Sequence, residues 1–217
     1  QVHSPFNGMT EVIGLVGRSF AGHAPADATL IVKSHPFDNG VTDYGRVVAA
    51  TGRTLGLSDR LVQADGGHLP SLLKRAAGVV IVNSTAGLQA IHHGCPTKLL
   101  GTAVYDHPAL VDPRPLNDFW RSPMQPDAEV YRRFRAALLA YCQFAGSFFS
   151  AEGMAALLPA VTQRLAGDAV SEPLIPAVPE PTHWPCTWPE WGAMSSAAAL
   201  LPADDTVFGR ITPASSA

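Results

Sequence analysis

Four short apolar runs, separated by stretches of helical length, constrain the fold of this chain more than any other feature of its sequence. They lie at residues 29–33, 60–63, 78–83 and 97–100 and are rich in Val, Ile and Leu. Runs that are apolar at nearly every position are typical of parallel strands covered by helices on both faces. The alternation from residue 9 to about residue 101 therefore predicts an α/β fold with a parallel sheet and flanking helices.

Capping residues and prolines indicate where the helices begin. Asn7 is placed to cap a helix through about Phe20, and Asp43 to cap one that reaches Leu55. Pro70 suits the first turn of a short helix that ends near Ala77. Three more helices are expected at residues 86–93, 127–144 and 151–166, the second with a buried stripe formed by Val130, Phe134, Leu138 and Tyr141. Residues 105–126 are expected to form a long ordered loop.

The composition changes sharply after residue 166. Residues 167–217 hold eight of the 19 prolines and three of the four tryptophans. Closely spaced prolines favour an extended linker over a packed element. We therefore expect one Rossmann-like domain at residues 1–166 and a Pro/Trp-rich extension at 167–217 that is a linker or is poorly ordered.

Charge and composition argue against several classes of function. The chain has 15 Lys and Arg against 18 Asp and Glu, which leaves no strongly basic surface to hold a nucleic-acid backbone. The three cysteines are far apart and form no C-x-x-C pair, and the histidines form no H-x-x-x-H pair, so no metal site is predicted. No apolar run approaches the roughly 20 residues that a membrane-spanning helix needs.

A basic and a titratable residue follow the first apolar run. Lys33, His35 and Pro36 stand where this strand is expected to end, and ligands of open parallel sheets bind beyond the carboxyl ends of the strands. Pro36 restricts His35 to an extended backbone. An imidazole there can donate to a phosphate oxygen or protonate a leaving group. A purely structural His-Pro turn is the alternative.

A second polar group follows the third run. Asn83, Ser84 and Thr85 lie where this strand leads into a helix, and the amides of a helix N-terminus attract anions. The stretch lacks G-x-x-x-x-G-K and G-x-G-x-x-G, so ATP and NAD are disfavoured. Helix capping alone is the alternative for both hydroxyls. The two strand ends together predict a site for a nucleotide phosphate, and Gly66 offers a flexible backbone at the same edge, suited to close approach by a base or ribose.

An ordered series of short motifs carries a resemblance to a known family. It consists of His35-Pro36, Asp43-Tyr44, Gly56-x-x-Asp59-Arg60, Asn83-Ser84-Thr85-x-Gly87-Leu88, His93-Gly94, Leu100-Gly101, Tyr105-Asp106, Asp118-Phe119-Trp120 and Gln143-x-x-Gly146-Ser147-Phe148. On these, residues 1–150 resemble the bacterial capsule polysaccharide synthesis family. They are most similar to its retaining β-Kdo glycosyltransferases, which use CMP-Kdo to build the Kdo linker between capsule chains and a lipid anchor. The His-Pro and Ser-Thr elements also occur in bacterial CMP-sialic acid transferases of the GT-B type.

The resemblance implies roles for individual residues. His35 would contact the CMP phosphate and assist its departure as the catalytic residue, and Ser84 and Thr85 would bind the same phosphate. Lys33 adds a positive charge on electrostatic grounds. Such donors can stabilise the departing anion with no metal and no further cofactor. The nucleophile is left open, with Asp38, Asp65 and Asp106 as candidates by position alone.

The resemblance also sets expectations for the whole protein. A GT-B enzyme has two Rossmann-like halves, and this chain matches only the donor-binding half, so we expect an acceptor half upstream of Gln1. The expected partners are a CMP-sugar and a lipid-linked acceptor, in the cytoplasm and peripheral to the cytoplasmic face of the inner membrane through the complete protein or other capsule-assembly proteins. Two alternatives stay open: a UDP-sugar transferase or epimerase-like enzyme, and a non-catalytic capsule export or scaffold protein.

Overall fold

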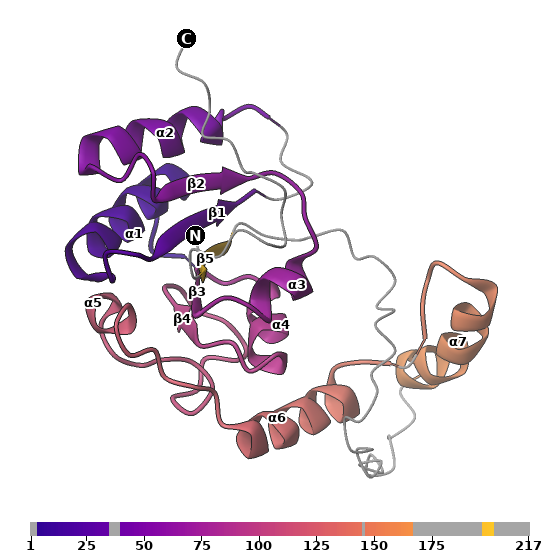
Figure 1. Cartoon of the computed structure of the whole chain (residues 1–217). Coiled ribbons are helices and arrows are strands. Elements are labelled where there is room, and N and C mark those ends of the chain that lie inside the picture. The colour runs from indigo at the N-terminus through magenta and orange to yellow at the C-terminus, as the bar shows by residue number, and fades with distance from the viewer. Residues whose placement is uncertain (1–3, 35–39, 145, 167–196, 202–217) are drawn as a thin grey trace. The chain divides into compact units, whose positions relative to one another are not determined.

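Two compact units make up the chain in the computed structural model, which describes residues 4–34, 40–144, 146–166 and 197–201 (Figure 1). Unit 1 contains residues 1–127 and 188–217, and unit 2 contains residues 128–187. His35 and Pro36, and all three tryptophans of the C-terminal extension, lie outside the described residues.

A five-stranded sheet forms the centre of unit 1. Its order is β2 (Leu61–Ala64), β1 (Thr29–Lys33), β5 (Ala197–Leu201), β3 (Gly78–Ile81) and β4 (Thr97–Leu99). The four predicted strands and the α/β class are confirmed. The expectation of a wholly parallel sheet is wrong, because β5 is antiparallel to both of its neighbours. This strand comes from the extension after residue 166, where no strand was predicted.

The register of β5 fixes the direction of the other strands. Ala199 is opposite Ile31 of β1 on one side and opposite Val79 of β3 on the other, antiparallel to both. Because β2 is parallel to β1 and β4 is parallel to β3, all four predicted strands run the same way. Their carboxyl ends therefore lie at one edge of the sheet.

Helices cover both faces of this sheet (Figure 1). Val80 of β3 and Val82, the residue directly after this strand, pack in a cluster with α1 (Met9–His23), α2 (Tyr44–Leu55) and α5 (Leu116–Phe119). Val79 and Ile81 pack instead with α3 (Leu69–Leu73) and α4 (Ala86–His92). Alternate residues of a strand point to opposite faces, so an apolar run such as β3 is buried on both sides.

Local chemistry explains where α1, α2 and α3 start and end. The Asp43 carboxylate accepts a hydrogen bond from the Arg46 amide at 3.0 Å, which confirms the predicted cap of α2. The predicted cap of α1 by Asn7 is wrong. The Asn7 amide donates to the Glu11 carboxylate at 2.9 Å, and Gly8 occupies the cap position without a side-chain bond. Helix α3 ends at Leu73, before the predicted end, because the chain must turn before β3 begins.

The segment after β4 is anchored on the α1 side by aromatic packing. Phe119 and Trp120 are buried, and the Trp120 ring meets Phe20 of α1 edge-on at a centroid distance of 5.3 Å. The Trp120 indole N–H donates to the Ser19 hydroxyl oxygen at 2.8 Å. The expected loop at residues 105–126 is therefore ordered, with α5 as a single helical turn inside it.

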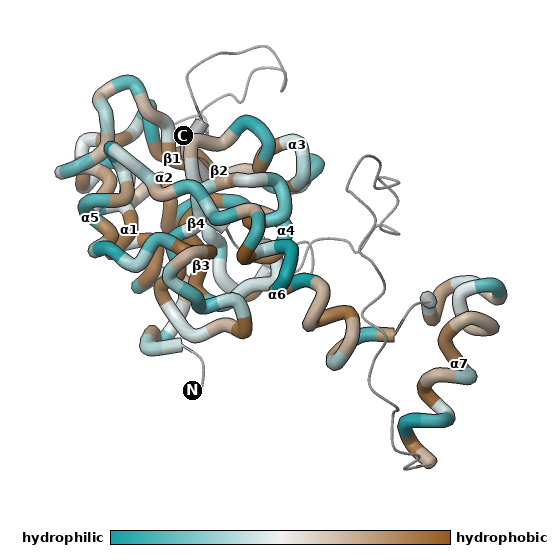
Figure 2. Tube along the Cα trace, turned by 90° about the horizontal axis from the view of Figure 1, so that it is seen from below, coloured by the Kyte–Doolittle hydropathy of each residue, from teal (hydrophilic) through white to brown (hydrophobic). Residues whose placement is uncertain are grey.

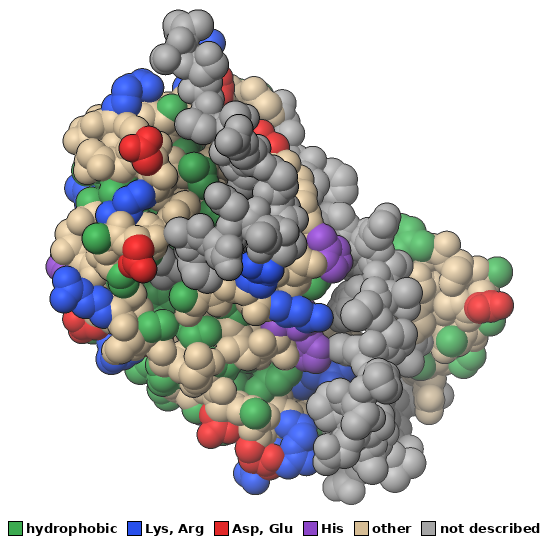
Figure 3. Space-filling model, viewed as in Figure 1, with side chains coloured by type: hydrophobic (Ala, Val, Ile, Leu, Met, Phe, Trp, Pro, Cys, Tyr) green, Lys and Arg blue, Asp and Glu red, His purple; other side chains and the backbone are tan. Residues whose placement is uncertain are grey.

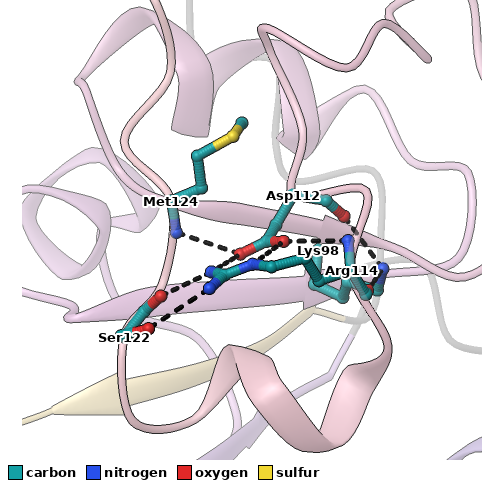
Figure 4. A network of polar contacts seen from close by, with 5 residues as sticks. All are labelled: Lys98, Asp112, Arg114, Ser122 and Met124. Carbon is teal, nitrogen blue, oxygen red and sulfur yellow. Dashed lines mark hydrogen bonds and ion pairs between the residues drawn. The ribbon is translucent and has the colours of Figure 1, made fainter.

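A buried polar network ties the same segment to β4 (Figure 4). The Asp112 carboxylate accepts hydrogen bonds from the Arg114 guanidinium, at 2.6 Å for the shortest, and from the Met124 amide at 3.0 Å. The Lys98 ammonium donates to the backbone carbonyls of Asp112 and Arg114. Burial alone would raise the pKa of Asp112, but the hydrogen bonds from Arg114 and Met124 lower it to about 2. Lys98 thus has a structural role, because its hydrogen bonds tie the segment after β4 to this strand.

Unit 2 contains α6 (Ala128–Tyr141) and α7 (Ala151–Leu165), and hydrophobic residues occur along both helices (Figure 2). Ser150 caps α7 by accepting a hydrogen bond from the Gly153 amide at 3.0 Å. The predicted buried stripe of α6 is wrong, because none of the residues of this helix is buried and Tyr141 is 60% exposed. Amphipathic spacing indicates which face is apolar but not whether a partner element covers it.

Within the described part of the chain, no helix has the length and apolar character required to cross a membrane.

Candidate functional site

The carboxyl ends of β1, β2 and β3 place polar residues along one edge of the sheet. β1 ends at Lys33, and the Ser34 amide extends its ladder by donating to the Ala64 carbonyl at 3.0 Å. On the other side of β5, β3 leads into Asn83 and Ser84. Strands in a sheet are about 4.8 Å apart, so the ends of β1 and β3 are separated by roughly 10 Å. The ends of β1 and β3 therefore lie at the same edge of the sheet, with β5 between them.

Lys33 is the most buried of the predicted site residues that the structure describes. Its side chain is 3% exposed, and its ammonium donates to the Ser34 carbonyl oxygen at 3.3 Å. Burial lowers the pKa of Lys33, and the nearby Asp65 carboxylate opposes that shift. An anion bound beside this ammonium would stabilise its charged form.

Gln63 joins the ends of β1 and β2, and sequence reasoning gave it no role. Its amide nitrogen donates to the Ser34 hydroxyl oxygen at 2.6 Å and to the Asp65 carboxylate at 2.8 Å. The sequence signal that could have identified Gln63 is its polar side chain at the end of an otherwise apolar run. Gly66 and Gly67 follow with φ of 84° and 80°, a region in which glycine is favoured. Gln63 thus fixes the start of the loop that contains Gly66 and Gly67.

The turn after β3 gives its two hydroxyl residues different tasks. Ser84 is half-buried, and its hydroxyl oxygen accepts a hydrogen bond from the Ala86 amide at 3.0 Å. Thr85 is exposed at the N-cap position of α4, and its side chain makes no capping hydrogen bond. Asn83 is exposed beside them. Helix capping, the structural alternative for both residues, therefore accounts for the Ser84 hydroxyl. The Thr85 hydroxyl makes no such hydrogen bond.

Tyr105 supports this turn from the loop after β4. Its hydroxyl donates to the Ser84 carbonyl oxygen. Its ring packs so closely on α4 that a Cβ added at Gly87 would lie 2.7 Å from Cε2 of Tyr105. Burial and the adjacent Asp106 raise the pKa of Tyr105 well above its usual value, so the phenol keeps its proton. In the sequence, Tyr105 was marked only by its place in the Tyr105-Asp106 motif of the family series.

The remaining candidates are placed as follows. His35, Pro36 and Asp38 lie outside the described residues, so their positions at the edge stay predictions. Asp65 and Asp106 are both exposed. Across residues 4–34, 40–144, 146–166 and 197–201, no three or more His, Cys, Asp and Glu side chains are grouped so that they could hold a metal ion.

The thiol of Cys95 has a structural place. It is buried against the carbonyl oxygens of Ala76 and Pro96, each 3.7 Å from the sulfur, and burial raises its pKa to about 12. A thiol with this pKa is not a nucleophile at neutral pH.

Comparisons with known proteins agree on one family. The family model described as capsule polysaccharide biosynthesis protein matches residues 1–149. Capsule polysaccharide modification protein LipB of Neisseria meningitidis serogroup A is 36% identical over 151 residues, which cover 69% of this chain and 36% of LipB. LipB of serogroup B matches to the same extent.

A third relative carries a different description. Capsule polysaccharide export protein KpsS of Escherichia coli is 35% identical over 141 residues, which cover 65% of this chain and 36% of KpsS. The chain thus spans little more than a third of the length of these relatives. No solved structure matches it. The match over residues 1–149 includes every strand end that forms the candidate site, and the chain belongs to the capsule polysaccharide biosynthesis protein family.

Proposed function

We propose that this chain is the donor-binding half of a GT-B glycosyltransferase that transfers β-Kdo from CMP-Kdo to a lipid-linked acceptor in capsule biosynthesis. The observation that carries the proposal is the shared edge of the sheet. Lys33 ends β1 there and Ser34 follows it, and Ser84 and Thr85 come after β3 on the same side. Ligands of open α/β sheets bind beyond the carboxyl ends of the strands, so this edge is where a nucleotide would be held.

Each group has a task suited to a single phosphate. The Thr85 hydroxyl, which does not cap its helix, would donate to a phosphate oxygen. The buried Lys33 ammonium would supply positive charge, and the anion would in turn offset the cost of its burial. His35, two residues beyond Lys33, would donate to the same phosphate and protonate it as the sugar leaves. Hydrogen-bond donors directed at a developing anion can stabilise it without a metal.

Transfer itself belongs to the whole protein in this proposal. The chain spans 36% of the length of its LipB and KpsS relatives, and an acceptor half would bring the lipid-linked sugar to the donor. We place that complex in the cytoplasm, at the cytoplasmic face of the inner membrane.

A second function is favoured by one specific observation. The relative KpsS is named an export protein, so a non-catalytic role in capsule export is the competing proposal. A protein of that kind would keep the fold and would have no need for a nucleotide at the sheet edge.

Calorimetric titration with CMP, UMP and UDP separates these possibilities. The proposal expects CMP to bind at least tenfold more tightly than UDP, and EDTA to leave the affinity for CMP unchanged. Tighter binding of UDP would support a UDP-sugar enzyme and contradict the Kdo proposal. Binding of none of the three would support the export role.

A further inference from the structure

The centre of the sheet in unit 1 differs from its two sides. β1 with β2 and β3 with β4 form parallel pairs, whereas β5 runs against both β1 and β3. The match to the family model ends at residue 149, so it includes β1 to β4 and leaves out β5 at residues 197–201. Among the described residues of the matched segment, no strand joins the two parallel pairs.

A protein that shares this segment needs a strand at the central position. Ile31 of β1 and Val79 of β3, which both pair with Ala199, are buried. Without a strand between β1 and β3, the backbone N–H and C=O groups at their inner edges would be buried without partners, which is costly. The matched segment therefore depends on a strand from another part of the protein.

Helix α1 shows from which edge of the sheet the chain comes before it reaches β1. α1 ends at His23 and β1 begins at Thr29, so the short connection between them brings the end of α1 to the amino end of β1. The helix has 15 residues and is about 22 Å long, somewhat more than the roughly 17 Å of β1. Met9 accordingly lines the same cavity as Val82 and Leu100, the residues directly after β3 and β4. The chain thus enters α1 at the carboxyl edge, where a strand parallel to β1 would end.

The face on which α1 packs shows on which side of β1 that strand would lie. α1 and α2 cover one face of the sheet, and charged side chains of both signs lie on the surface over them (Figure 3). α2 links β1 to β2, a step away from β5, whereas α4 links β3 to β4 in the opposite direction and packs on the other face. Connections between parallel strands share one hand, so helices that lead in the same direction lie on the same face. The step through α1 into β1 therefore starts on the β5 side of β1, at the central position.

The packing over the central position leaves a small gap. A cavity of about 20 Å³ lies between α1 and the sheet, lined by apolar side chains of α1, β1 and β3. Because β1 and β3 flank β5, this cavity lies over the central position. The sequence of β5 is Ala-Ala-Ala-Leu-Leu, whereas buried strands of parallel sheets are rich in Val and Ile. A strand of such branched residues would bring more apolar volume to this position.

We propose that the position between β1 and β3 binds a parallel strand of branched apolar residues that leads directly into α1, and that β5 stands in for this strand in the present chain. The match covers 36% of LipB, so a protein of that length has ample further chain to supply the strand. The sheet would then have the order of doubly wound folds, with the first strand central and the later ones on either side. The proposal goes beyond donor binding and does not depend on it.

Hydrogen exchange in an extended chain tests the proposal. The extension Lys-Val-Val-Ile-Val, placed directly before Gln1, supplies a strand that can continue into α1. We expect the amides of β5 to exchange at least tenfold faster in the extended chain than in the unaltered chain, as measured by mass spectrometry of peptic fragments. Those of β1 and β3 should change less than twofold, because both strands keep a partner. The matched extension Lys-Pro-Val-Pro-Val cannot pair as a central strand and should leave β5 protected.

A proline in β5 gives an independent measurement. Ala199 pairs with Ile31 on one side and with Val79 on the other, so Ala199→Pro removes a backbone donor from the centre of the sheet. The substitution should lower the midpoint of thermal unfolding of the unaltered chain by about 5 °C or more. In the extended chain it should lower the midpoint by less than about 1 °C, because β5 no longer occupies the position.

Three results would overturn the proposal. The first is that β5 stays as protected in the extended chain as in the proline control. The second is that β1 and β3 lose protection together with β5, since the extension would then unfold the sheet rather than complete it. The third is an equal effect of Ala199→Pro in the two chains. CMP binding does not enter any of these measurements, so failure here is distinct from failure of the donor site.

Discussion

The ring of Tyr105 occupies the space that a side chain at Gly87 would need, and its hydroxyl donates to the carbonyl oxygen of Ser84. A residue of the loop after β4 thereby fixes the turn that carries the proposed phosphate donors. The backbone of Gly87 itself donates to Ser84, at 3.0 Å from its amide to the carbonyl oxygen. Tyr105 and Gly87 thus form one structural unit with the turn.

Substitution at Gly87 should destabilise the protein through Tyr105. Gly87→Ala is expected to lower the free energy of unfolding by roughly 1–3 kcal/mol, because the added methyl group overlaps the phenol ring. Tyr105→Phe should cost about 1 kcal/mol through the lost hydrogen bond. Urea unfolding measures both. The control Gly22→Ala, on α1 with open space around the added methyl, should be neutral or stabilising.

A double variant isolates the packing interaction between residue 87 and the ring of Tyr105. In a Tyr105→Leu background the cost of Gly87→Ala should fall by at least 1 kcal/mol, since the overlapping ring is absent. A cost for Gly87→Ala that is the same in both backgrounds would contradict the packing that we describe.

Ser84 and Thr85 should respond differently to removal of their hydroxyls. Ser84→Ala is expected to lower the free energy of unfolding by about 1 kcal/mol, because the Ala86 amide loses its acceptor. Thr85→Ala should leave stability within about 0.5 kcal/mol and weaken CMP binding about tenfold. Thermal unfolding and calorimetry on the same samples separate the two effects. A Thr85→Ala variant with full affinity for CMP would remove Thr85 from the site.

Asp112 should make the protein sensitive to acid. Its pKa of about 2 in the folded state is below the unfolded value of about 3.9, so its contribution is complete above about pH 5 and is lost as the pH falls toward 2. We expect Asp112→Asn to cost about 2 kcal/mol at pH 7, and the difference from the unaltered chain to shrink below pH 4. Urea unfolding at pH 7 and pH 3 checks this. Glu129→Gln, which removes the exposed ion pairs to Arg132 and Arg133 on α6, should leave the stability close to that of the unaltered chain.

Protonation of His93 should affect the stability of the protein at higher pH than protonation of Asp112 does. Its folded pKa of about 4 is below the unfolded value of about 6.5, so the unfolded state takes up the proton first and stability falls as the pH drops from 6.5 to 4. His93→Gln removes this loss, and the variant should gain stability relative to the unaltered chain over that range. A constant difference from pH 7 to pH 4 would show that the imidazole does not titrate as described.

Much of unit 1 is predictable from local sequence, because β1 and β3 are buried apolar runs and the Asp43 carboxylate caps α2. The strand β5 was missed for a physical reason. Its sequence, Ala-Ala-Ala-Leu-Leu, has no β-branched residue and follows a Pro-rich stretch, and it forms a strand only through pairing with β1 and β3.

The candidate site was predictable in part. The position of Ser84 and Thr85 at a strand-to-helix junction follows from the apolar run of β3 and the helical stretch after it. The difference between the two hydroxyls does not, because it depends on which oxygen accepts the Ala86 amide in the folded turn. The roles of Gln63 and Tyr105 depend on contacts between segments distant in sequence, which spacing alone does not encode.

The most direct test of the account is a map of backbone amide shifts by nuclear magnetic resonance as CMP is added to the isotope-labelled chain. The account predicts the largest changes at both strand ends together, at the amides of Ser34 after β1 and of Thr85 and Ala86 after β3, with small changes at Lys74 and Arg75. Shifts confined to one strand end, or located away from this edge of the sheet, would contradict the nucleotide site.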